Sequence, residues 1–593
     1  MSLDEQRIDD VFSPPLAAPR ESAARRRRRA LATGATSLVI AVLLIAPLFS
    51  SGYLLQLATD ILMSIALAYS WNLISGFTGY LSFGQVSFFG IGAYATAALV
   101  LHTPIPWYVA IVFAALLAGV AATALGTVML RLRGIMFALG MLGLARILGV
   151  LAQNIPFIGG AVGLTLPAQL TPIPVYIAMA VAALAGFGLN LFFSRSQWGL
   201  AAMGVRDDEG AAAALGVPTV RVKVMSFVLS ALVPAAVGGI VAWNRSFLDP
   251  PSAFDPTLDL QVVVFTLFGG IGTLWGPALG GLVLMLVGEE LWAYVPDLQL
   301  ALYGLLVIAV VLTFPGGIVG LANRFGWLRR RPILAPPAFP PVERPAAAVA
   351  SSGEGPPILE VRDLTVRFGG VVALDHISLS VRRGETVCII GANGAGKTTM
   401  FNAITGFVPP SEGAVLFEGV PLAPASAFER ARRGIARTFQ IPRLMHSMTV
   451  WENVLLPASN GRRSAEAVGQ AAWALQTVGL DALWLEPAES LTPGRQRRLE
   501  LARALALEPR LILLDEVMAG TTREEQEEIR AVLRRLKEFG IAAVAGVEHV
   551  IAAVVDLSDR MIVLDQGRKI AEGPPEAVLR DPAVIHSYLG ELQ

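Results

Sequence analysis

The chain has little charge for its length. Charged residues make up 16% of its 593 residues, against about 25% in ordinary soluble domains. The shortage falls between residues 31 and 325, and the rest has the composition of a soluble protein. A chain of this length exceeds what one hydrophobic core holds. We therefore expect at least two domains, one of them strongly apolar.

Cysteine is almost absent. Cys388 is the only one, and it stands in an apolar stretch typical of a buried strand. A single cysteine excludes an intramolecular disulfide and a zinc site built from cysteine and histidine. We therefore expect neither a disulfide framework nor a structural zinc centre.

Long apolar runs take the place of charge. Segments of roughly twenty apolar residues can cross a bilayer as helices. We expect about ten such spans, near residues 31–50, 54–75, 81–102, 107–130, 134–153, 172–194, 222–244, 258–274, 277–293 and 298–320. Glycine clusters at Gly76–Gly92 and Gly269–Gly281 predict broken or re-entrant helices. Arg146 is the clearest ionisable group inside a span, and such groups are functional candidates.

Arginines predict the orientation of these spans. Arg25–Arg29 stand just before the first one, and cytoplasmic flanks carry an excess of positive charge. A nucleic-acid-binding patch and a cleaved signal peptide are the rival interpretations of this leader. A cytoplasmic N-terminus also places the later arginines on the inner side, namely Arg131, Arg133, Arg195, Arg206 and Arg329–Arg331.

Composition divides the chain into four parts. Residues 1–30 form a basic cytoplasmic leader, and residues 31–325 a polytopic all-α membrane domain. Residues 326–357 are a proline-rich linker. From residue 358 to 593, apolar strands alternate with amphipathic helices, which indicates an α/β domain.

One loop in the last part predicts nucleotide binding. Gly391–Thr398 fits G-x-x-x-x-G-K-[ST], whose backbone N–H groups cradle phosphates. The apolar run Thr386–Ile390 supplies the strand before it, and the following residues open a helix whose dipole faces the phosphates. We expect ATP to contact Gly391, Asn393, Gly394, Ala395, Gly396, Lys397, Thr398 and Thr399.

Two acids follow a second buried strand. Leu511–Leu514 is apolar, and Asp515 and Glu516 come directly after it. A carboxylate at that strand end can hold Mg²⁺ beside the Thr398 hydroxyl. Glu516 is then placed to orient or deprotonate an attacking water. Lys397 neutralises the β- and γ-phosphates.

Residues 358–593 resemble the nucleotide-binding domain of ABC transporters, an α/β P-loop fold with a helical subdomain. The resemblance implies that Phe368 stacks on adenine. It implies that Gln440, in Arg437-Thr-Phe-Gln440, touches Mg²⁺ and signals to the membrane domain. It also implies that His549 contacts the γ-phosphate, so Glu516, His549 and Gln440 form the catalytic set.

The signature segment departs from the family pattern. This chain has Thr492, Pro493, Gly494 and Arg495 where the family has serine, two glycines and glutamine. ABC sites form between two domains, each phosphate loop being closed by the partner's signature. We therefore expect a complete phosphate loop here, and a signature whose Thr492, Gly494 and Arg495 form a weaker site with the partner.

The apolar half resembles permease subunits of the branched-chain and hydrophobic amino acid uptake family. The matching segments are rich in glycine and cover residues 71–94 and 268–281. Residues 198–216 resemble the family's coupling segment, which docks on the ATPase near the glutamine loop. A merely solvated helix is the alternative. The coupling residues that the resemblance implies are Arg206, Asp208, Glu209 and Gly216.

Together these resemblances imply an importer subunit in the bacterial inner membrane, a permease fused to its ATPase. The expected cargo is a branched-chain amino acid, and the alternative is urea, a carboxylate or an aromatic acid. Expected partners are a second permease and a second ATPase, identical or related, an extracytoplasmic solute-binding protein and lipid, but no nucleic acid. An ABC exporter is a rival, although it has about six spans and long cytoplasmic helices. A non-transport ABC ATPase would lack the apolar half.

Overall fold

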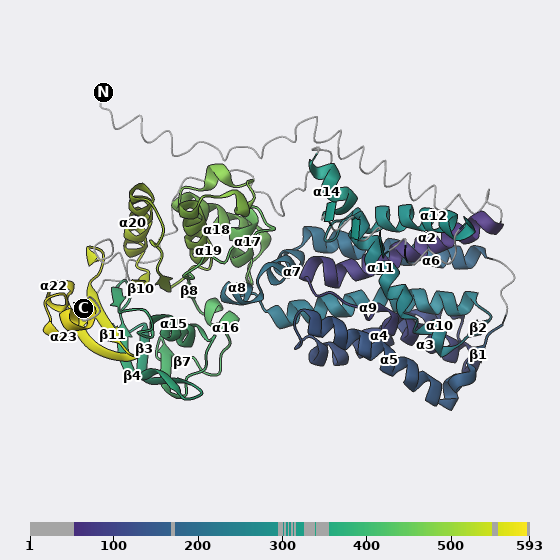
Figure 1. Cartoon of the computed structure of the whole chain (residues 1–593), viewed down its shortest axis with the longest axis horizontal. Coiled ribbons are helices and arrows are strands. Elements are labelled where there is room, and N and C mark those ends of the chain that lie inside the picture. Colours follow the sequence, from purple (N-terminus) through teal and green to yellow (C-terminus); the bar gives the residue numbers. More distant parts are fainter. Residues whose placement is uncertain are drawn as a thin grey trace, which may run out of the picture. The chain divides into compact units, whose positions relative to one another are not determined.

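The computed structural model describes residues 52–167, 172–294, 316–324, 355–547 and 555–589, with a few single positions between 301 and 339. The chain forms two compact units (Figure 1). Most of the chain before Arg330 belongs to the first unit, and the chain after it belongs to the second. Residues 77–79 and 192–226 pack with the second unit although they precede Arg330.

Long apolar helices dominate the first unit. Within the described residues, six are long and apolar enough to cross a membrane. They are α2 with the π-helical turn after it (Gly52–Phe77), α3 (Gln85–His102), α4 (Trp107–Met129), α5 (Ile135–Asn154), α6 (Ile173–Arg195) and α9 (Thr219–Asn244). Each of the six coincides with a predicted span.

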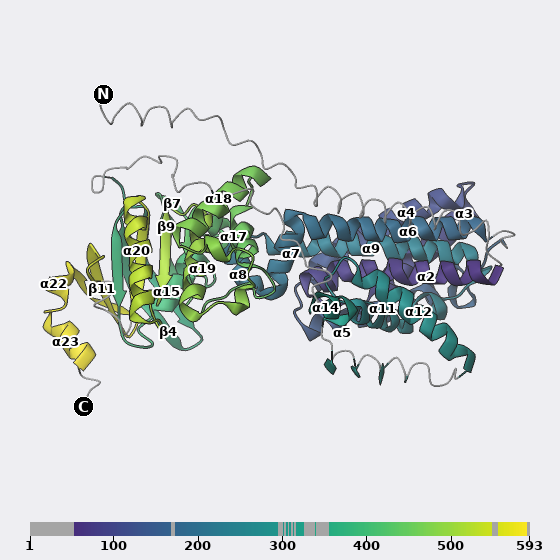
Figure 2. The same ribbon diagram turned by 90° about the horizontal axis from the view of Figure 1, so that it is seen from above.

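Two further helices lie at predicted spans. α11 (Pro256–Gly269) and α12 (Gly276–Tyr294) pack against each other and against α2, and Figure 2 shows the three side by side. α11 has 14 residues, too few to cross a bilayer alone. The predicted span at 31–50 and about half of that at 298–320 lie outside the described residues.

Short elements complete the first unit. A two-residue strand, β1 (Leu164–Thr165), pairs antiparallel with β2 (Phe247–Leu248), so the segment after α5 is joined to the segment after α9. The short helix α10 (Pro250–Ala253) packs against α3 and α5, and α14 (Gly317–Arg324) packs against α11 and α12.

The helices break at the two predicted glycine clusters. Polar side chains there satisfy backbone groups that no water can reach in a bilayer. Buried Asn72, in the π-helical turn, donates to Asn190 Oδ1 at 2.8 Å and accepts from the Gly272 N–H at 2.7 Å. At the start of α3, the Val86 N–H donates to Oδ1 of buried Asp259 at 3.0 Å. The breaks are therefore held by side chains from distant helices.

Glycine brings α3 and α9 into backbone contact. A Cβ atom added at Gly92 would lie 2.0 Å from the Ala235 carbonyl oxygen. One added at Gly238 would lie 2.0 Å from the Phe89 carbonyl oxygen. Such close approach gives helices in a membrane their van der Waals contact.

Two sheets form the frame of the second unit. The larger has the order β12-β11-β5-β10-β9-β8, all parallel except β12. Its members are β5 (Thr386–Ile390), β8 (Ile435–Arg437), β9 (Leu511–Asp515), β10 (Ala542–Val547), β11 (Arg560–Asp565) and β12 (Arg568–Gly573). The smaller, antiparallel sheet has the order β4-β3-β6-β7, from β3 (Leu359–Phe368), β4 (Val371–Val381), β6 (Glu412–Phe417) and β7 (Val420–Pro421).

Helices cover the larger sheet and extend from it. They are α15 (Lys397–Thr405), α16 (Ala427–Arg432), α17 (Val450–Ala458), α18 (Ser464–Thr477), α19 (Pro493–Ala506), α20 (Arg523–Glu538), α22 (Pro575–Val578) and α23 (Pro582–Leu589). α17 and α20 begin at capping boxes, Thr449 with Glu452 and Thr522 with Glu525. α17, α18 and α19 pack on one another. The unit is therefore an α/β P-loop fold.

Candidate nucleotide site and coupling segment

The predicted phosphate loop connects β5 to α15. Gly394 and Gly396 have φ of 83° and 103°, which glycine adopts without strain. A Cβ atom at Gly396 would lie 2.9 Å from the Ala373 carbonyl oxygen. The buried Lys397 ammonium donates to the Gly391 and Ala392 carbonyl oxygens at 2.6 and 3.0 Å. The cation is thereby held within the loop that motif and geometry assign to phosphates.

The carboxylate at the end of β9 lies beside the loop. Asp515 is 1% exposed, and its Oδ2 accepts from the Thr398 hydroxyl at 3.5 Å. Its backbone N–H donates to the Thr438 hydroxyl at 3.1 Å. One carboxylate and one hydroxyl are the protein oxygens that a P-loop offers to Mg²⁺, whose other ligands are phosphates and water. The residues present therefore fit the ion.

Glu516 has an unusual backbone conformation. Its φ is 47°, in the left-handed region that non-glycine residues rarely enter. Its N–H donates to the Gly546 carbonyl on β10, and its Oε1 accepts from the Gln440 amide at 3.2 Å. Such strain costs of order 1–3 kcal/mol and concentrates at functional sites. The turn thus brings the predicted base and the predicted glutamine together.

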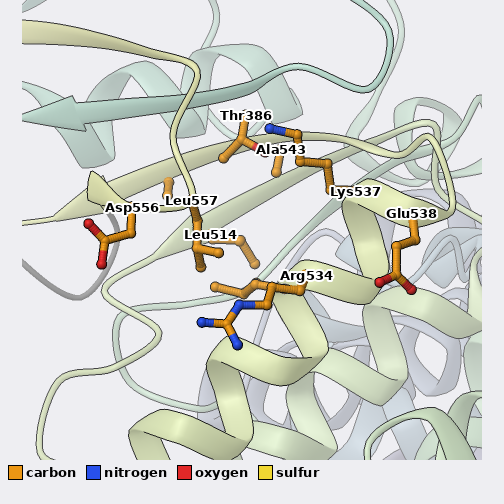
Figure 3. A pocket seen from close by; sticks show the side chains of 10 residues that line it. Thr386, Leu514, Arg534, Lys537, Glu538, Ala543, Asp556 and Leu557 are labelled. Carbon is orange, nitrogen blue, oxygen red and sulfur yellow. The ribbon is translucent and has the colours of Figure 1, made fainter. Parts of the chain in front are cut away.

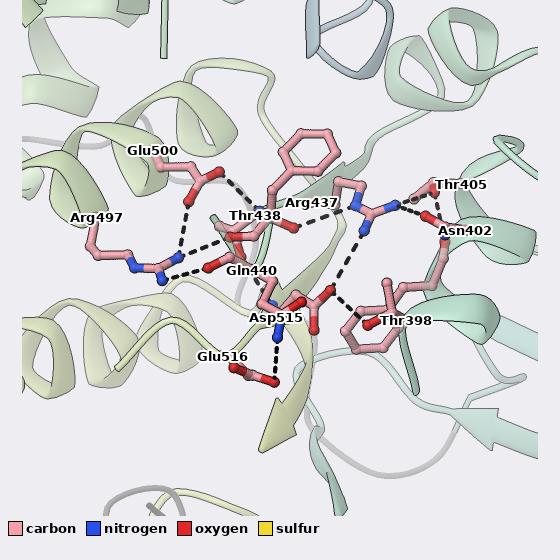
Figure 4. A network of polar contacts seen from close by, with 12 residues as sticks. Thr398, Asn402, Thr405, Arg437, Thr438, Gln440, Arg497, Glu500, Asp515 and Glu516 are labelled. Atoms are coloured by element: carbon pink, nitrogen blue, oxygen red, sulfur yellow. Dashed lines mark hydrogen bonds and ion pairs between the residues drawn. The ribbon is translucent and has the colours of Figure 1, made fainter. Parts of the chain in front are cut away.

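A buried polar network surrounds these residues (Figure 4). Arg497 on α19 donates to the Phe439 and Gln440 carbonyl oxygens at 2.9 and 2.5 Å. Glu500, one turn later, accepts from the Phe439 N–H at 2.9 Å. Burial raises the pKa of Glu500 to about 7. Composition and motifs did not reveal this network, because its contacts join residues about 60 positions apart.

The other predicted nucleotide contacts are residues of the phosphate loop and of α15, Phe368 at the end of β3, and His549. Asn393 and Gly394 are exposed on the loop, Ala395 is buried, and Thr399 is half-buried in the first turn of α15. The Phe368 side chain, at the end of β3, is 51% exposed, as a ring that stacks on a base requires. His549 lies outside the described residues.

The signature segment begins α19. Thr492 is the residue before the helix, Pro493 occupies its first position, and Arg495 is exposed. Gly494 is buried, and a Cβ atom there would lie 2.1 Å from Oε1 of Glu525 on α20. A larger residue at this position would therefore displace the Glu525 carboxylate, a neighbour that the sequence did not indicate.

The predicted coupling segment forms two helices, α7 (Gln197–Asp207) and α8 (Glu209–Ala214), within the second unit. Asp208 caps α8 through the Ala211 N–H at 2.8 Å and pairs with Arg443 at 3.6 Å. Glu209 pairs with Lys223 at 2.7 Å. This segment is therefore not a merely solvated helix.

The sequence did not predict the other contacts of α7 and of the residues after α8. Oδ1 of Asp207 pairs with Arg206 at 3.5 Å, and its Oδ2 accepts from the Ser447 N–H at 2.8 Å. Gly216, with φ of 77°, accepts through its carbonyl oxygen from Arg432 Nε at 3.0 Å. Ser447 and Arg432 each lie more than 200 positions from the residue they contact, so no local spacing relates these two pairs.

A shallow pocket of about 380 Å³ lies elsewhere in the second unit (Figure 3). Its lining includes Thr386, Arg534, Lys537, Glu538 and Asp556, from β5, α20 and the segment before β11. No residue of the phosphate loop lines it. This pocket is separate from the nucleotide site.

Comparisons with known proteins match both halves of the chain. The ABC transporter family model matches residues 374–519. The permease component of the branched-chain amino acid transport system matches residues 53–311. The branched-chain amino acid ATP-binding cassette transporter model matches residues 568–591.

Individual relatives cover the second unit. The high-affinity branched-chain amino acid transport ATP-binding protein BraF of Pseudomonas aeruginosa is 38% identical over 252 residues, 40% of this chain and 98% of the relative. This chain belongs to the branched-chain amino acid ABC transporter family. LivG of Escherichia coli K12, with the same description, is 37% identical over 251 residues and the same shares. A probable LivG of Archaeoglobus fulgidus is 35% identical over 246 residues, 39% of this chain and 95% of the relative.

A solved ATP-binding cassette of an ABC transporter also aligns with this part of the chain. It is 33% identical and covers 40% of this chain and 99% of its own length, with a TM-score of 0.37. Membership of the family implies that ATP hydrolysis is coupled to transport. The permease and the ATPase of this family member stand in one polypeptide.

Proposed function

We propose that this chain is the fused permease–ATPase subunit of a binding-protein-dependent importer of branched-chain amino acids. The observation that carries the proposal is the pair of family matches in one chain, a permease over residues 53–311 and an ATPase over residues 374–519. The cargo follows from the relatives, which are described as branched-chain amino acid transport proteins.

The proposed architecture has about ten spans. Six long helices lie at six of these spans, and the shorter α11 and α12 lie at two more. We assign residues 1–30 to a cytoplasmic leader, 31–325 to the permease, 326–357 to the linker and 358–593 to the ATPase. α17, α18 and α19 are the helical subdomain of the ATPase. The N-terminus and the ATPase lie on the cytoplasmic side of the inner membrane.

The proposed hydrolysis uses the groups at the loop and at the end of β9. Backbone N–H groups of the loop and Lys397 bind the phosphates, while the Phe368 ring stacks on adenine. Thr398, Asp515 and Gln440 would hold Mg²⁺, which neutralises charge that develops on the phosphates. Glu516, with Gln440 as its hydrogen-bond partner, orients and deprotonates water. His549 contacts the γ-phosphate.

The proposed assembly has two permeases, two ATPases and an external solute-binding protein. Thr492, Gly494 and Arg495 face the partner's phosphate loop, and the altered signature weakens that site. ATP shifts the ATPases toward a closed pair because it binds that state more tightly. Arg206, Asp208, Glu209 and Gly216, on or beside α7 and α8, transmit closure to the permease. The contacts of Asp208 with Arg443 and of Gly216 with Arg432, within the second unit, support this role.

Uptake by the assembled complex tests the proposal. Proteoliposomes containing the complex should accumulate labelled leucine, isoleucine or valine when the binding protein and ATP are present. A non-hydrolysable ATP analogue should stop accumulation. If the complex takes up only urea, a carboxylate or an aromatic acid, that solute is the cargo, and the assignment of branched-chain amino acids is wrong. Export, or ATP hydrolysis stimulated only by nucleic acid, would contradict the proposal.

One face of α5 predicts where the partner permease binds. Arg146 is exposed in the middle of this apolar helix, where a charge facing lipid is costly. The exposed face of α4, in contrast, carries no charged side chain and includes Val112, Leu116 and Val120. The predicted first span, residues 31–50, contains no carboxylate that could pair with Arg146. We expect a second permease to supply one.

Cross-linking tests this interface. Cys388 is fully buried, so an introduced cysteine is the reactive thiol. A cysteine replacing the exposed Val150 on α5 should cross-link to the partner permease, whereas one replacing Val120 on α4 should not. Arg146→Leu should weaken co-purification of the partner. Stronger co-purification, or equal cross-linking at both positions, would show that α5 faces lipid.

A further inference from the structure

Two guanidinium groups lie over the ring of Phe439. Arg437 Cζ is 4.6 Å from the ring centroid, and Arg443 Cζ is 4.9 Å from it. A cation over an aromatic face within about 6 Å is attracted by the ring's quadrupole. Each guanidinium also pairs with a carboxylate, Arg437 with Asp515 at 3.7 Å and Arg443 with Asp208 at 3.6 Å.

These contacts form one unbroken series within the second unit. It runs from Asp515, beside the phosphate loop, through Arg437, Phe439 and Arg443 to Asp208, between α7 and α8. The ring is in the middle of the series, with an arginine next to it on each side and a carboxylate at each end. The nucleotide site and the coupling segment are therefore joined by direct contacts of side chains.

The nucleotide end of the series is rigid. The side chains of Arg437 and Asp515 are 3% and 1% exposed. Arg437 also donates to Asn402 Oδ1 at 2.7 Å and to the Thr405 hydroxyl at 3.1 Å, both on α15, the helix that follows the phosphate loop. Burial lowers the pKa of Arg437 to about 10, so the group stays charged at neutral pH.

The coupling end is more exposed. The side chains of Arg443 and Asp208 are 49% and 30% exposed. The backbone of Arg443 is nevertheless fixed, because buried Arg503 on α19 donates to its carbonyl oxygen at 2.6 Å. A Cβ atom at Gly210 on α8 would lie 3.6 Å from Arg443 Nη1, an ordinary van der Waals distance, so the guanidinium lies next to the coupling segment.

The backbone of Thr438 is hydrogen-bonded to the sheet, whereas that of the next residue, Phe439, is hydrogen-bonded to α19. The Thr438 N–H donates to the Leu513 carbonyl on β9 at 2.9 Å, so Thr438 belongs to the sheet. Phe439, in contrast, is held on both sides of its backbone by Glu500 and Arg497 of α19. If α19 shifts relative to the sheet, the ring moves against Arg437 while its contact with Arg443 is kept.

We propose that Phe439 is a positioning residue that couples the nucleotide site to the coupling segment through its two cation–π contacts. Movement of α19 changes the contact of the ring with Arg437, and Arg443 carries the change to Asp208. This inference rests on the proposed coupling of hydrolysis to import. It goes beyond it by assigning the coupling to one aromatic face and two arginines.

Kinetics of the complete transporter in proteoliposomes test the proposal. Phe439→Leu removes the aromatic face, and the stimulation of ATP turnover by leucine-loaded binding protein should fall about 10-fold, within the usual range of coupling. The KM for ATP should stay within about twofold. Phe439→Tyr keeps an aromatic face and should restore most of the stimulation. Equal loss in the leucine and tyrosine variants, or normal stimulation in the leucine variant, would overturn the proposal.

Phe428 offers a matched control. Its ring is half-buried and carries a single guanidinium, that of Arg432 at 5.8 Å, which donates to the Gly216 carbonyl. This pair touches the coupling segment without lying in the series from Asp515. Phe428→Leu should leave stimulation within about twofold. If Phe428→Leu lost as much stimulation as Phe439→Leu, both rings would act only by holding the coupling segment in place, and the proposal would be wrong.

A double-mutant cycle between Phe439→Leu and Asp208→Asn adds a test at the other end of the series, where the asparagine side chain can still cap α8. Residues in one series should show non-additive effects, and the double variant should lose little more than either single variant. If the loss of stimulation in the double variant equals the product of the two single losses, the two residues act independently and the proposed series is wrong. If the unmodified complex shows no ATP-dependent uptake, the proposed function fails. If it transports leucine and the cycle is additive, only this inference fails.

Discussion

Replacing Glu516 with glutamine is expected to lower ATP hydrolysis at this phosphate loop about 10²–10⁴-fold, the usual contribution of a positioned general base. The amide keeps the size of the side chain but cannot accept a proton from water. Lys397 and the loop are unchanged, so ATP should still bind. ATPase assays and nucleotide-binding titrations of the assembled complex measure the two effects separately.

Glu508 is the matched control for this variant. It shares the left-handed backbone conformation, with φ of 54°, but is exposed and pairs with Arg462. Glu508→Gln should leave hydrolysis unchanged. In a complex with a related ATPase, two ATP sites form. Glu516→Gln should abolish hydrolysis at the site that uses this chain's phosphate loop. The remaining activity should come from the partner's phosphate loop, which the altered signature of this chain closes. Unchanged total hydrolysis would show that Glu516 is not the base and would remove the proposed asymmetry.

Replacing Arg497 with methionine is expected to destabilise the second unit by about 3–5 kcal/mol, the usual cost of breaking a buried ion pair. The change removes the guanidinium that lies 3.8 Å from the Glu500 carboxylate, so that Arg503 remains as its charged neighbour, and it removes both hydrogen bonds to the glutamine loop. Thermal unfolding of the purified chain in detergent should show the loss as a fall of at least about 6 °C in the transition temperature.

Arg495 is two positions away on the same helix and exposed. Arg495→Met should change stability by less than about 0.5 kcal/mol, as surface substitutions usually do. An equal effect of the two substitutions would attribute the loss to the propensity of α19 rather than to the buried pair. No effect of Arg497→Met would show that the network contributes little to the fold.

Local patterns were sufficient to predict the elements of the nucleotide site. The loop 391–398, the strand ending in Asp515 and the helix after the loop all lie where motif and apolar runs placed them. The same holds for the six long apolar helices. Apolar runs and glycine-rich turns act over a few residues, so their signals are complete within a short stretch of chain.

Residues that connect the elements could not be predicted in this way. Asp259, Glu500 and Arg497 are ionisable groups whose burial is intelligible only from their partners on other elements. Burial of a charge depends on whether tertiary packing brings a donor or an opposite charge within reach. Neither hydropathy nor local spacing contains that information.

The sequence by itself determined that one chain carries an apolar helical half and a P-loop ATPase, because hydropathy and loop motifs are local properties. Only the tertiary structure decided that residues 192–226 pack with the second unit. It also decided that Arg437 and Arg443 both lie over the ring of Phe439. These contacts depend on how strands, helices and loops pack in three dimensions, and packing brings together side chains that are far apart along the chain.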